Sequence, residues 1–199
     1  MLSTKKWNLV RTAFWVVLFA TACVCGAVSA QPVETKITAS DAAAFDQFGW
    51  MVAISGDRAL VAANFDDDDG SKSGSVYVYE FDGTTWVQSA KLTASDARAG
   101  DEFGESVAIS GDRALVGATF DDDAGTSSGS AYVFDFDGTT WVQVAKLTAG
   151  DTAAGDEFGQ SVAISGDRAL VGAQGDDDNG SSSGSAYVFD FDGTTWVQV

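Results

Sequence analysis

The sequence contains no histidine, and its two cysteines, Cys23 and Cys25, lie within the first thirty residues. Beyond those residues the chain has no thiol for a disulfide, for a cysteine-ligated zinc or for nucleophilic catalysis. It also has no imidazole, the commonest general acid or base in enzymes. A single proline, Pro32, precedes the rest of the chain, which shows no helical periodicity. The composition therefore excludes the enzyme classes that depend on histidine or cysteine.

The first thirty residues have the pattern of a secretory signal peptide. A basic start is followed by an apolar run at 13–24, which is short for a membrane span of about 20 residues, and by small residues before the expected cleavage site. We predict a signal peptide at 1–30 and a connector at 31–35. The protein would then be secreted or at the cell surface, periplasmic or extracellular, with no membrane span after cleavage. The alternatives are a retained signal anchor and a lipid-anchored form through Cys23.

Basic residues are scarce, with 11 against 29 acidic residues. Three of them, Lys5, Lys6 and Arg11, lie in the predicted signal peptide, so cleavage takes the formal net charge from −18 to −21. A surface this negative repels nucleic acid and anionic membranes, and we expect neither as a partner. Recurrent runs of aliphatic and aromatic residues argue against disorder despite the charge.

The rest of the sequence is one unit written three times. The motif D-x-F-G begins at Asp46, Asp101 and Asp156, a spacing of 55 residues in both cases. Repeats of this period indicate an array of small units stacked on one another. The three predicted repeats occupy residues 36–90, 91–145 and 146–199.

Each unit carries four strand signals, which form two hairpins. In residues 105–118, two apolar runs flank Gly111 and Asp112, a pair that can supply a tight hairpin turn. With that turn, Ile109 faces Ala114. The hairpin is then apolar on both faces, so we expect it to be covered on both sides.

The second hairpin covers residues 129–149, with a turn at Asp137 and Gly138. That turn would set Phe134 opposite Trp141. The equivalent pairs in the other units would be Tyr79 with Trp86 and Phe189 with Trp196. A four-residue loop is the alternative. We interpret the recurring tryptophan as core packing between units.

Four antiparallel strands per unit, apolar on both faces, are typical of a β-propeller blade. We therefore predict an all-β fold, a β-propeller-like array of three four-stranded antiparallel blades. Closed propellers have about four to eight blades, so three form an incomplete ring. We favour a fragment of a longer propeller; an open arc and oligomers that complete a ring are the alternatives. Open blade edges would favour self-association.

Residues 101–118, "DEFGESVAISGDRALVGA", resemble the FG-GAP repeat, and the resemblance extends from Lys36 to Val199. It is strongest to the bacterial form, with its "SGSAYVF" strand and "KLTA" segment. The resemblance implies a β-propeller distantly similar to the integrin α-chain head, and roles in adhesion or ligand binding rather than catalysis. Integrin-type repeats hold calcium in a D-x-D-x-D loop. At that place this chain has only Ser110–Arg113, too short to wrap a cation, so calcium is not expected there.

A separate run of aspartates in each unit is a candidate cation site. The run "FDDDDGSKSGS" begins at Phe65, and similar runs begin at Phe120 and Gly175. Carboxylates on a Gly/Ser-rich turn can offer calcium several oxygen ligands, which makes calcium the one candidate cofactor. We favour a solvated acidic turn, because adjacent side chains of an extended chain point to alternate sides. The candidate ligands are Asp66, Asp67, Asp68, Asp69, Asp121, Asp122, Asp123, Asp176, Asp177 and Asp178.

Four further recurring residues are assigned structural roles, which apply equally to their counterparts 55 residues away. Asp101 is predicted to cap a turn through backbone amides. Phe103 is predicted to be a core wedge, and Gly104 to allow close backbone approach. Arg113, after the Gly-Asp turn, is predicted to pair with a neighbouring acid at the surface.

These observations predict a secreted or cell-surface repeat protein that is not an enzyme. It would bind, adhere or act as a scaffold through a propeller-like face, with an unidentified protein or polysaccharide as its ligand. A carboxylate-based secreted hydrolase and an inert structural spacer are the alternatives. Glycoside hydrolysis requires two carboxylates in different roles, whereas each acidic motif here recurs in every unit.

Overall fold

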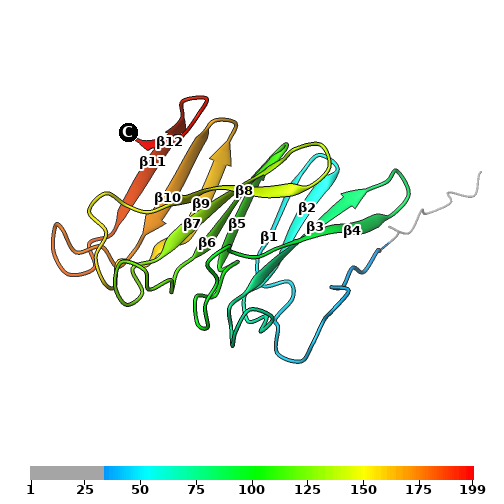
Figure 1. Ribbon diagram of the computed structural model, residues 1–199, viewed down its shortest axis with the longest axis horizontal. Helices are drawn as coiled ribbons and strands as arrows, with labels where there is room; N and C mark the ends of the chain where they lie inside the picture. The colour runs from blue at the N-terminus through cyan, green and yellow to red at the C-terminus, as the bar shows by residue number, and fades with distance from the viewer. Residues whose placement is uncertain (1–33) are drawn as a thin grey trace, which may run out of the picture. The chain divides into compact units, whose positions relative to one another are not determined.

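Residues 34–199 are described by the computed structural model, and within this range the chain forms twelve β-strands and no helix. The strands make three antiparallel sheets of four (Figure 1). This confirms the predicted all-β, propeller-like array with an incomplete ring. The signal peptide expected at 1–30 lies outside the described residues. Within the described part of the chain, no helix is long and apolar enough to cross a membrane.

Each sheet is built from consecutive strands. The first comprises β1 (Val52–Ser55), β2 (Arg58–Ala63), β3 (Ser75–Phe81) and β4 (Trp86–Leu92). The second comprises β5 (Ser106–Ser110), β6 (Arg113–Ala118), β7 (Ser130–Phe136) and β8 (Trp141–Leu147). The third comprises β9 (Phe158–Ser165), β10 (Arg168–Ala173), β11 (Ser185–Phe191) and β12 (Trp196–Gln198).

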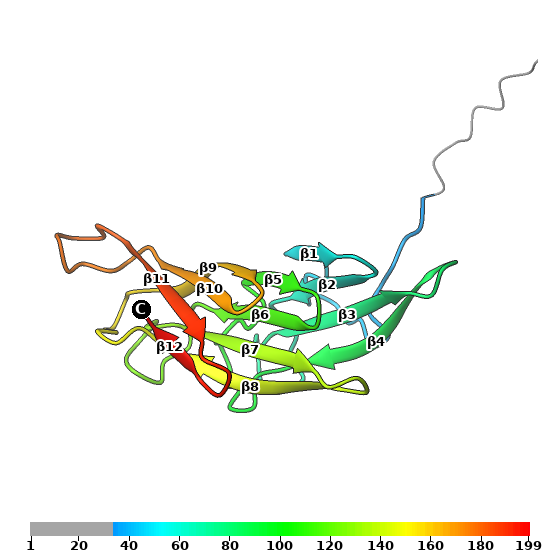
Figure 2. The same cartoon turned by 90° about the horizontal axis from the view of Figure 1, so that it is seen from above.

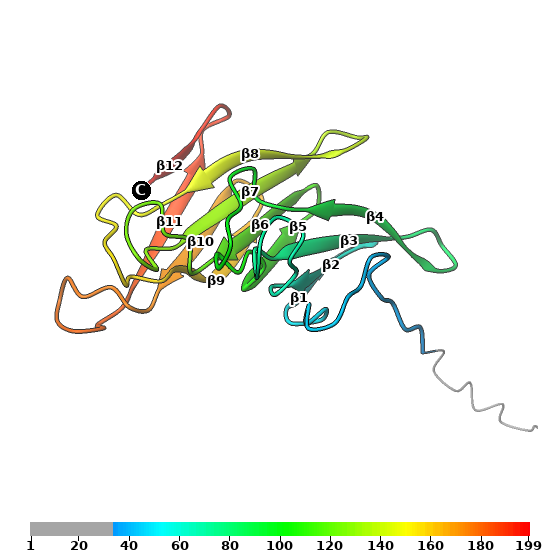
Figure 3. The ribbon, with the colours of Figure 1, turned by 60° about the horizontal axis from the view of Figure 1, so that its bottom comes forward.

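The three sheets stand one behind another within residues 35–199. Strand β5 contacts both β1 and β9, so the first strands of the sheets lie next to one another (Figure 2). Successive strands then lead outward to β4, β8 and β12. The long β10–β11 loop and the β11–β12 turn lie at opposite ends of the strands, as Figure 3 shows for the third sheet. We call these the loop end and the turn end, and every sheet has both.

The register predicted for the first hairpin is confirmed. Ile109 pairs with Ala114 across the two-residue turn at Gly111 and Asp112. The middle sheet is covered on both sides as expected, because Val116 packs in the core shared with the first sheet while its neighbour Leu115 packs in the core shared with the third.

The register predicted for the second hairpin is wrong by two residues. Trp141 pairs with Phe136 rather than Phe134, and the loop has four residues, the alternative considered above. The Asp137 carboxylate holds this loop by accepting hydrogen bonds from the amides of Thr139 and Thr140, both at 2.8 Å. Because side chains alternate faces with a period of two, the shift leaves the tryptophan on the expected face. The same correction replaces Tyr79–Trp86 by Phe81–Trp86 and Phe189–Trp196 by Phe191–Trp196.

The predicted role of Phe103 as a core wedge is confirmed, because its side chain packs between two sheets. Phe103 is fully buried and meets the rings of Tyr132 and Phe134 edge-on, with centroid distances of 5.5 and 5.9 Å. Phe158 is equally buried in the next interface. Trp141 packs against the same core as Phe103, as predicted for the recurring tryptophan.

The sheets approach so closely that their backbones touch at glycine. A Cβ at Gly129 would overlap the carbonyl oxygen of Phe158, and one at Gly74 would overlap that of Phe103. Gly104, as predicted, lies against the backbone of the preceding sheet. The inter-sheet distance is therefore set by backbone contact as well as by side chains.

The variant Gly129→Ala should test this contact. Gly129 has φ +79°, which costs alanine about 1 kcal/mol on its own, and overlap with a backbone atom should cost about 1–3 kcal/mol more. The matched control is Gly184→Ala, with φ +72° but its nearest neighbour at 3.4 Å, a carbonyl oxygen of its own loop. Urea unfolding of dilute protein should show the larger loss for Gly129→Ala. Equal losses would mean that backbone strain alone is responsible.

Candidate functional site

The aspartate run of the first unit closes around a lysine ammonium. Asp66 is buried, and its carboxylate accepts hydrogen bonds from the Tyr77 hydroxyl at 2.8 Å and from the Lys91 Nζ at 3.0 Å. The same Nζ lies 2.5 Å from Asp68 and 2.8 Å from Asp41. Three carboxylates therefore share one ammonium. Two of them come from the β2–β3 loop and one from the segment before β1.

The second unit repeats this cluster. Lys146 Nζ lies 2.8 Å from Asp121, 2.6 Å from Asp123 and 2.7 Å from Asp96. Burial by itself would raise the pKa of Asp121, but hydrogen bonds from the Lys146 ammonium and the Tyr132 hydroxyl outweigh it, and the pKa lies below its ordinary value. Burial likewise disfavours the charged ammonium, yet its three carboxylate partners hold the pKa of Lys146 above its ordinary value.

The local sequence explains which aspartates turn inward. The run lies in a turn in which the amide of the third aspartate donates to the carboxylate of the first, at 3.1 Å for Asp68 and Asp66 and at 2.9 Å for Asp123 and Asp121, so both face the lysine. The second faces away: Asp67 accepts a hydrogen bond from the Lys72 amide at 2.8 Å, and Asp122 accepts one from the Ser127 amide at 2.7 Å. These side-chain to backbone bonds are typical of aspartate in turns.

The third unit has the same carboxylates with a different charge balance. Asp151, Asp176 and Asp178 lie together, and Asp176 accepts a hydrogen bond from the Tyr187 hydroxyl at 2.5 Å. No lysine of the described residues lies among them. Repulsion from Asp176 and then Asp151 raises the pKa of Asp178.

The candidate ligands thus divide into two groups. The structure brings together Asp66 with Asp68, Asp121 with Asp123 and Asp176 with Asp178. It leaves the remaining predicted residues exposed and outside the clusters: Asp67, Asp69, Asp122 and Asp177. The first aspartate of each run, Asp66, Asp121 or Asp176, is buried and bonded to a tyrosine hydroxyl, which differs from the solvated turn that we favoured, whereas the third aspartate stays exposed.

The residues of the first two clusters do not fit calcium. Calcium would have to take the position already held by the Lys91 or Lys146 ammonium, which satisfies the same carboxylate oxygens. The protein supplies its own cation there. In the third cluster, no histidine, cysteine or further carboxylate of the described residues joins the three aspartates.

Sequence reasoning missed several members of these clusters. It did not include Asp41, Asp96 or Asp151, which lie before the first strand of each sheet, nor the lysine at the end of the fourth strand. The signal was the repeat itself, since a lysine in "AKLTA" recurs with the aspartates at 55-residue spacing.

The predicted turn caps are present at the loop end. Asp46, Asp101 and Asp156 accept hydrogen bonds from the amides of Ala43, Arg98 and Ala153, at 2.6, 2.8 and 2.6 Å. Burial raises the pKa of Asp101, and the bond from the Arg98 amide only partly offsets it.

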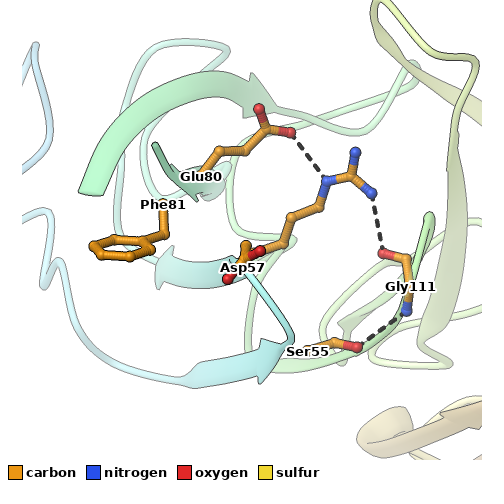
Figure 4. Close-up of a pocket in the computed structure, with 6 residues that line it drawn as sticks. Ser55, Asp57, Glu80, Phe81 and Gly111 are labelled. Atoms are coloured by element: carbon orange, nitrogen blue, oxygen red, sulfur yellow. Dashed lines mark hydrogen bonds and ion pairs between the residues drawn. The ribbon is translucent and has the colours of Figure 1, made fainter. Parts of the chain in front are cut away.

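At the turn end, Arg58 reaches from the first sheet to the second. It pairs with Glu80 in its own sheet at 3.0 Å, as predicted, and also with Asp112 in the turn of the next sheet. Figure 4 shows the guanidinium between Glu80 and the Gly111 carbonyl, with the Gly111 amide donating to the Ser55 hydroxyl. These groups line a shallow pocket.

The guanidinium groups also stack on aromatic rings of the next sheet, a contact that sequence reasoning missed. The Arg58 guanidinium lies 4.4 Å from the ring centre of Phe136, and that of Arg113 lies 4.8 Å from Phe191. Arg113 makes the equivalent ion pairs, with Asp135 at 2.7 Å and with Asp167 of the following sheet at 2.8 Å. Each of these two arginines therefore links two sheets by charge and by cation–π contact.

Comparison with family models agrees with this repeated geometry. The FG-GAP repeat matches residues 33–79, 86–134 and 141–189. The chain belongs to the FG-GAP repeat family. Each match covers the first three strands of one sheet, and the second and third matches begin with β4 and β8, the outer strands of the preceding sheets. Phe103 with Gly104 is the motif that wedges one sheet against the next. Among curated proteins, no sequence matches the chain.

Proposed function

We propose that this FG-GAP repeat protein is a secreted or cell-surface protein that binds a partner through its loop end and carries out no catalysis. The family is generally non-enzymatic, and its members are often extracellular or at the cell surface. The observation that carries the proposal is the division of the aspartates at the loop end. In the first two units the inward ones share a lysine ammonium, whereas Asp67, Asp122 and Asp177 are exposed on equivalent loops.

A repeated set of exposed carboxylates suits a basic partner surface. Because the loops recur in consecutive sheets, a partner with several positive groups could contact more than one loop, and each added contact would increase avidity. Complementary charge of this kind raises the association rate and makes binding weaker at high salt. Calcium has no part in the proposal, since lysine occupies the first two clusters.

The test is binding to immobilised extracellular proteins and polysaccharides, with polylysine as a reference for charge alone. The variant Asp67→Asn/Asp122→Asn/Asp177→Asn removes three charges, while the amide oxygen of asparagine can still accept the turn hydrogen bonds. Binding to the partner should weaken about tenfold or more, roughly 1.4 kcal/mol.

The matched control carries the same change at the turn end, Asp82→Asn/Asp137→Asn/Asp192→Asn, where each aspartate also accepts hydrogen bonds from its own turn. Its binding should equal that of the unaltered chain. Binding of the chain to polylysine but to no immobilised protein or polysaccharide would contradict the proposal. Chemical turnover of any of these proteins or polysaccharides would contradict it as well.

A further inference from the structure

The two outer faces of the array expose residues whose counterparts are buried between sheets. Leu170, on the third sheet, is 44% exposed, whereas its counterparts Leu60 and Leu115 are 0% exposed. On the first sheet, Val52 is 66% exposed, whereas its counterpart Val107 is 8% exposed. Figure 1 places these two sheets at opposite ends of the array. Each end face is therefore one half of the interface that occurs twice within the chain.

The third sheet also presents an arginine without its usual neighbour. The side chains of Arg58 and Arg113 are 22% and 16% exposed, because each lies on the next sheet. The side chain of Arg168 is 67% exposed, and among the described residues its ion pair is with Asp190 of its own sheet. It has the same position in its repeat and the same first partner as the other two, and the described residues place no second sheet against it.

The first sheet presents the acceptor that would match this arginine. Phe81 and Trp86 form the same tilted pair, with centroids 5.5 Å apart, as the pair on which Arg58 lies in the second sheet. Phe81 is 37% exposed, and the described residues place no guanidinium over it. Asp57 occupies the turn position from which Asp112 and Asp167 pair with an arginine of the preceding sheet.

The backbones of the two end faces have matching shapes as well. Gly129 contacts the backbone of Phe158 in the following sheet, whereas its counterpart Gly184 has only its own loop nearby. Gly159 contacts the preceding sheet, whereas nothing lies within 4 Å of a Cβ built at its counterpart Gly49. The close approach seen at both internal interfaces could therefore form between these two faces without a clash at glycine.

We propose that a second copy of this chain covers both end faces, head to tail, so that two copies form a closed ring of six sheets. Arg168 of each copy would lie on Phe81 and Trp86 of the other and pair with its Asp57. The contact is heterologous, with a different patch on each side, and such contacts close only when the rotation between units completes a circle. Six sheets fall within the range of about four to eight at which propellers close.

This proposal takes up the oligomer that completes a ring, one of the alternatives considered from the sequence, and it differs from the self-association through open blade edges. The contact uses sheet faces, as within the chain, and not the unpaired backbone groups of edge strands. It is tested independently of the proposed partner binding, because Asp57 and Arg168 lie at the turn end and the aspartates of the proposed partner site lie at the loop end.

The test is the mass of the full 199-residue chain in solution, measured by light scattering over about a hundredfold range of concentration. The unaltered chain should show twice the mass of a single chain at the higher concentrations. Arg168→Asp places like charge against Asp57 and should weaken association about tenfold or more. Circular dichroism of this exposed variant should show unchanged strand content.

The double variant Asp57→Arg/Arg168→Asp restores opposite charges across the contact and should recover the dimer. Arg98→Asp is the matched control: it changes charge by the same amount at an exposed side chain, 64% accessible, in the connection between the first two sheets. It should leave the mass unchanged. A single-chain mass for the unaltered protein at every concentration would overturn the proposal. A dimer that persists in Arg168→Asp, or a double variant that stays as single chains, would overturn it equally.

Discussion

Replacing Phe103 with alanine should lower the free energy of unfolding by about 3–5 kcal/mol, the range for truncating a fully buried aromatic side chain. Phe103 is 0% exposed and contacts two aromatic rings of its own sheet. The cavity would open between the first and second sheets, where backbone contact at Gly74 limits how far the sheets can close on it. Chemical denaturation of the purified chain gives the measurement.

The control is the same truncation at Phe48. Its ring meets Tyr77 and Tyr79 at centroid distances of 5.5 and 6.2 Å, close to those of Phe103, but no preceding sheet of the described residues covers it. The expected loss is about 1–2 kcal/mol, because less surface leaves water when Phe48 packs. Both variants should be made in the Arg168→Asp background, so that a second copy cannot cover Phe48. Equal losses at the two positions would show that the covering sheet contributes nothing at this site.

Replacing Lys146 with methionine should cost about 2–3 kcal/mol at neutral pH. The substitution keeps the apolar stem and removes the ammonium, which leaves the charge of the buried Asp121 with hydrogen bonds from the Tyr132 hydroxyl and the Asp123 amide but no cation. Removing one partner of a fully buried ion pair costs about 3–5 kcal/mol, and we expect less here because Lys146 is 21% exposed. Lys72→Met is the control: Lys72 is 49% exposed and 3.9 Å from Glu102, so its loss should cost under about 1 kcal/mol.

The same substitution should reverse the contribution of Asp121 to the pH dependence of stability. In the unaltered chain the folded-state pKa of Asp121 is lowered, so the stability it contributes is present above about pH 4 and is lost as the pH falls through that pKa. Without the ammonium, burial would raise the folded-state pKa above the unfolded value. Asp121 would then destabilise the fold at neutral pH and would do so less as the pH falls.

Urea unfolding at several pH values between about 4 and 7 measures this reversal as the difference between Lys146→Met and the unaltered chain. The stability gap should narrow as the pH falls. A gap that stays constant across this range would contradict the assignment of Lys146 as the counter-ion of Asp121.

The repeat units and their strands could be predicted because their signals are local. Two apolar runs on either side of a Gly-Asp turn specify a hairpin within about a dozen residues, which is why the pairing of Ile109 with Ala114 was predicted correctly. The second hairpin was misregistered because the loop length depends on a side-chain contact. Asp137 folds back onto the amides of Thr139 and Thr140, and the composition of the turn did not distinguish this from a two-residue turn.

The aspartate clusters could be predicted only in part. The separation of Asp66 and Asp68 from Asp67 is local, because the Asp68 amide donates to the Asp66 carboxylate while the Asp67 carboxylate accepts from the Lys72 amide. That the inward pair meets Lys91, 25 residues from Asp66, depends on the pairing of β3 with β4 and on how the segment before β1 returns to the same loop. No local pattern contains that information.

The sequence by itself determined that the chain forms three equivalent all-β units with two apolar faces each, because the period of its side chains and the chemistry of its turns recur every 55 residues. Only the tertiary structure decided which charges meet. A carboxylate selects its cation through distances between residues far apart in the chain, and those distances follow from strand pairing and from the close stacking of one sheet on the next. For the same reason Arg58 and Arg113 are enclosed while the identical Arg168 is exposed.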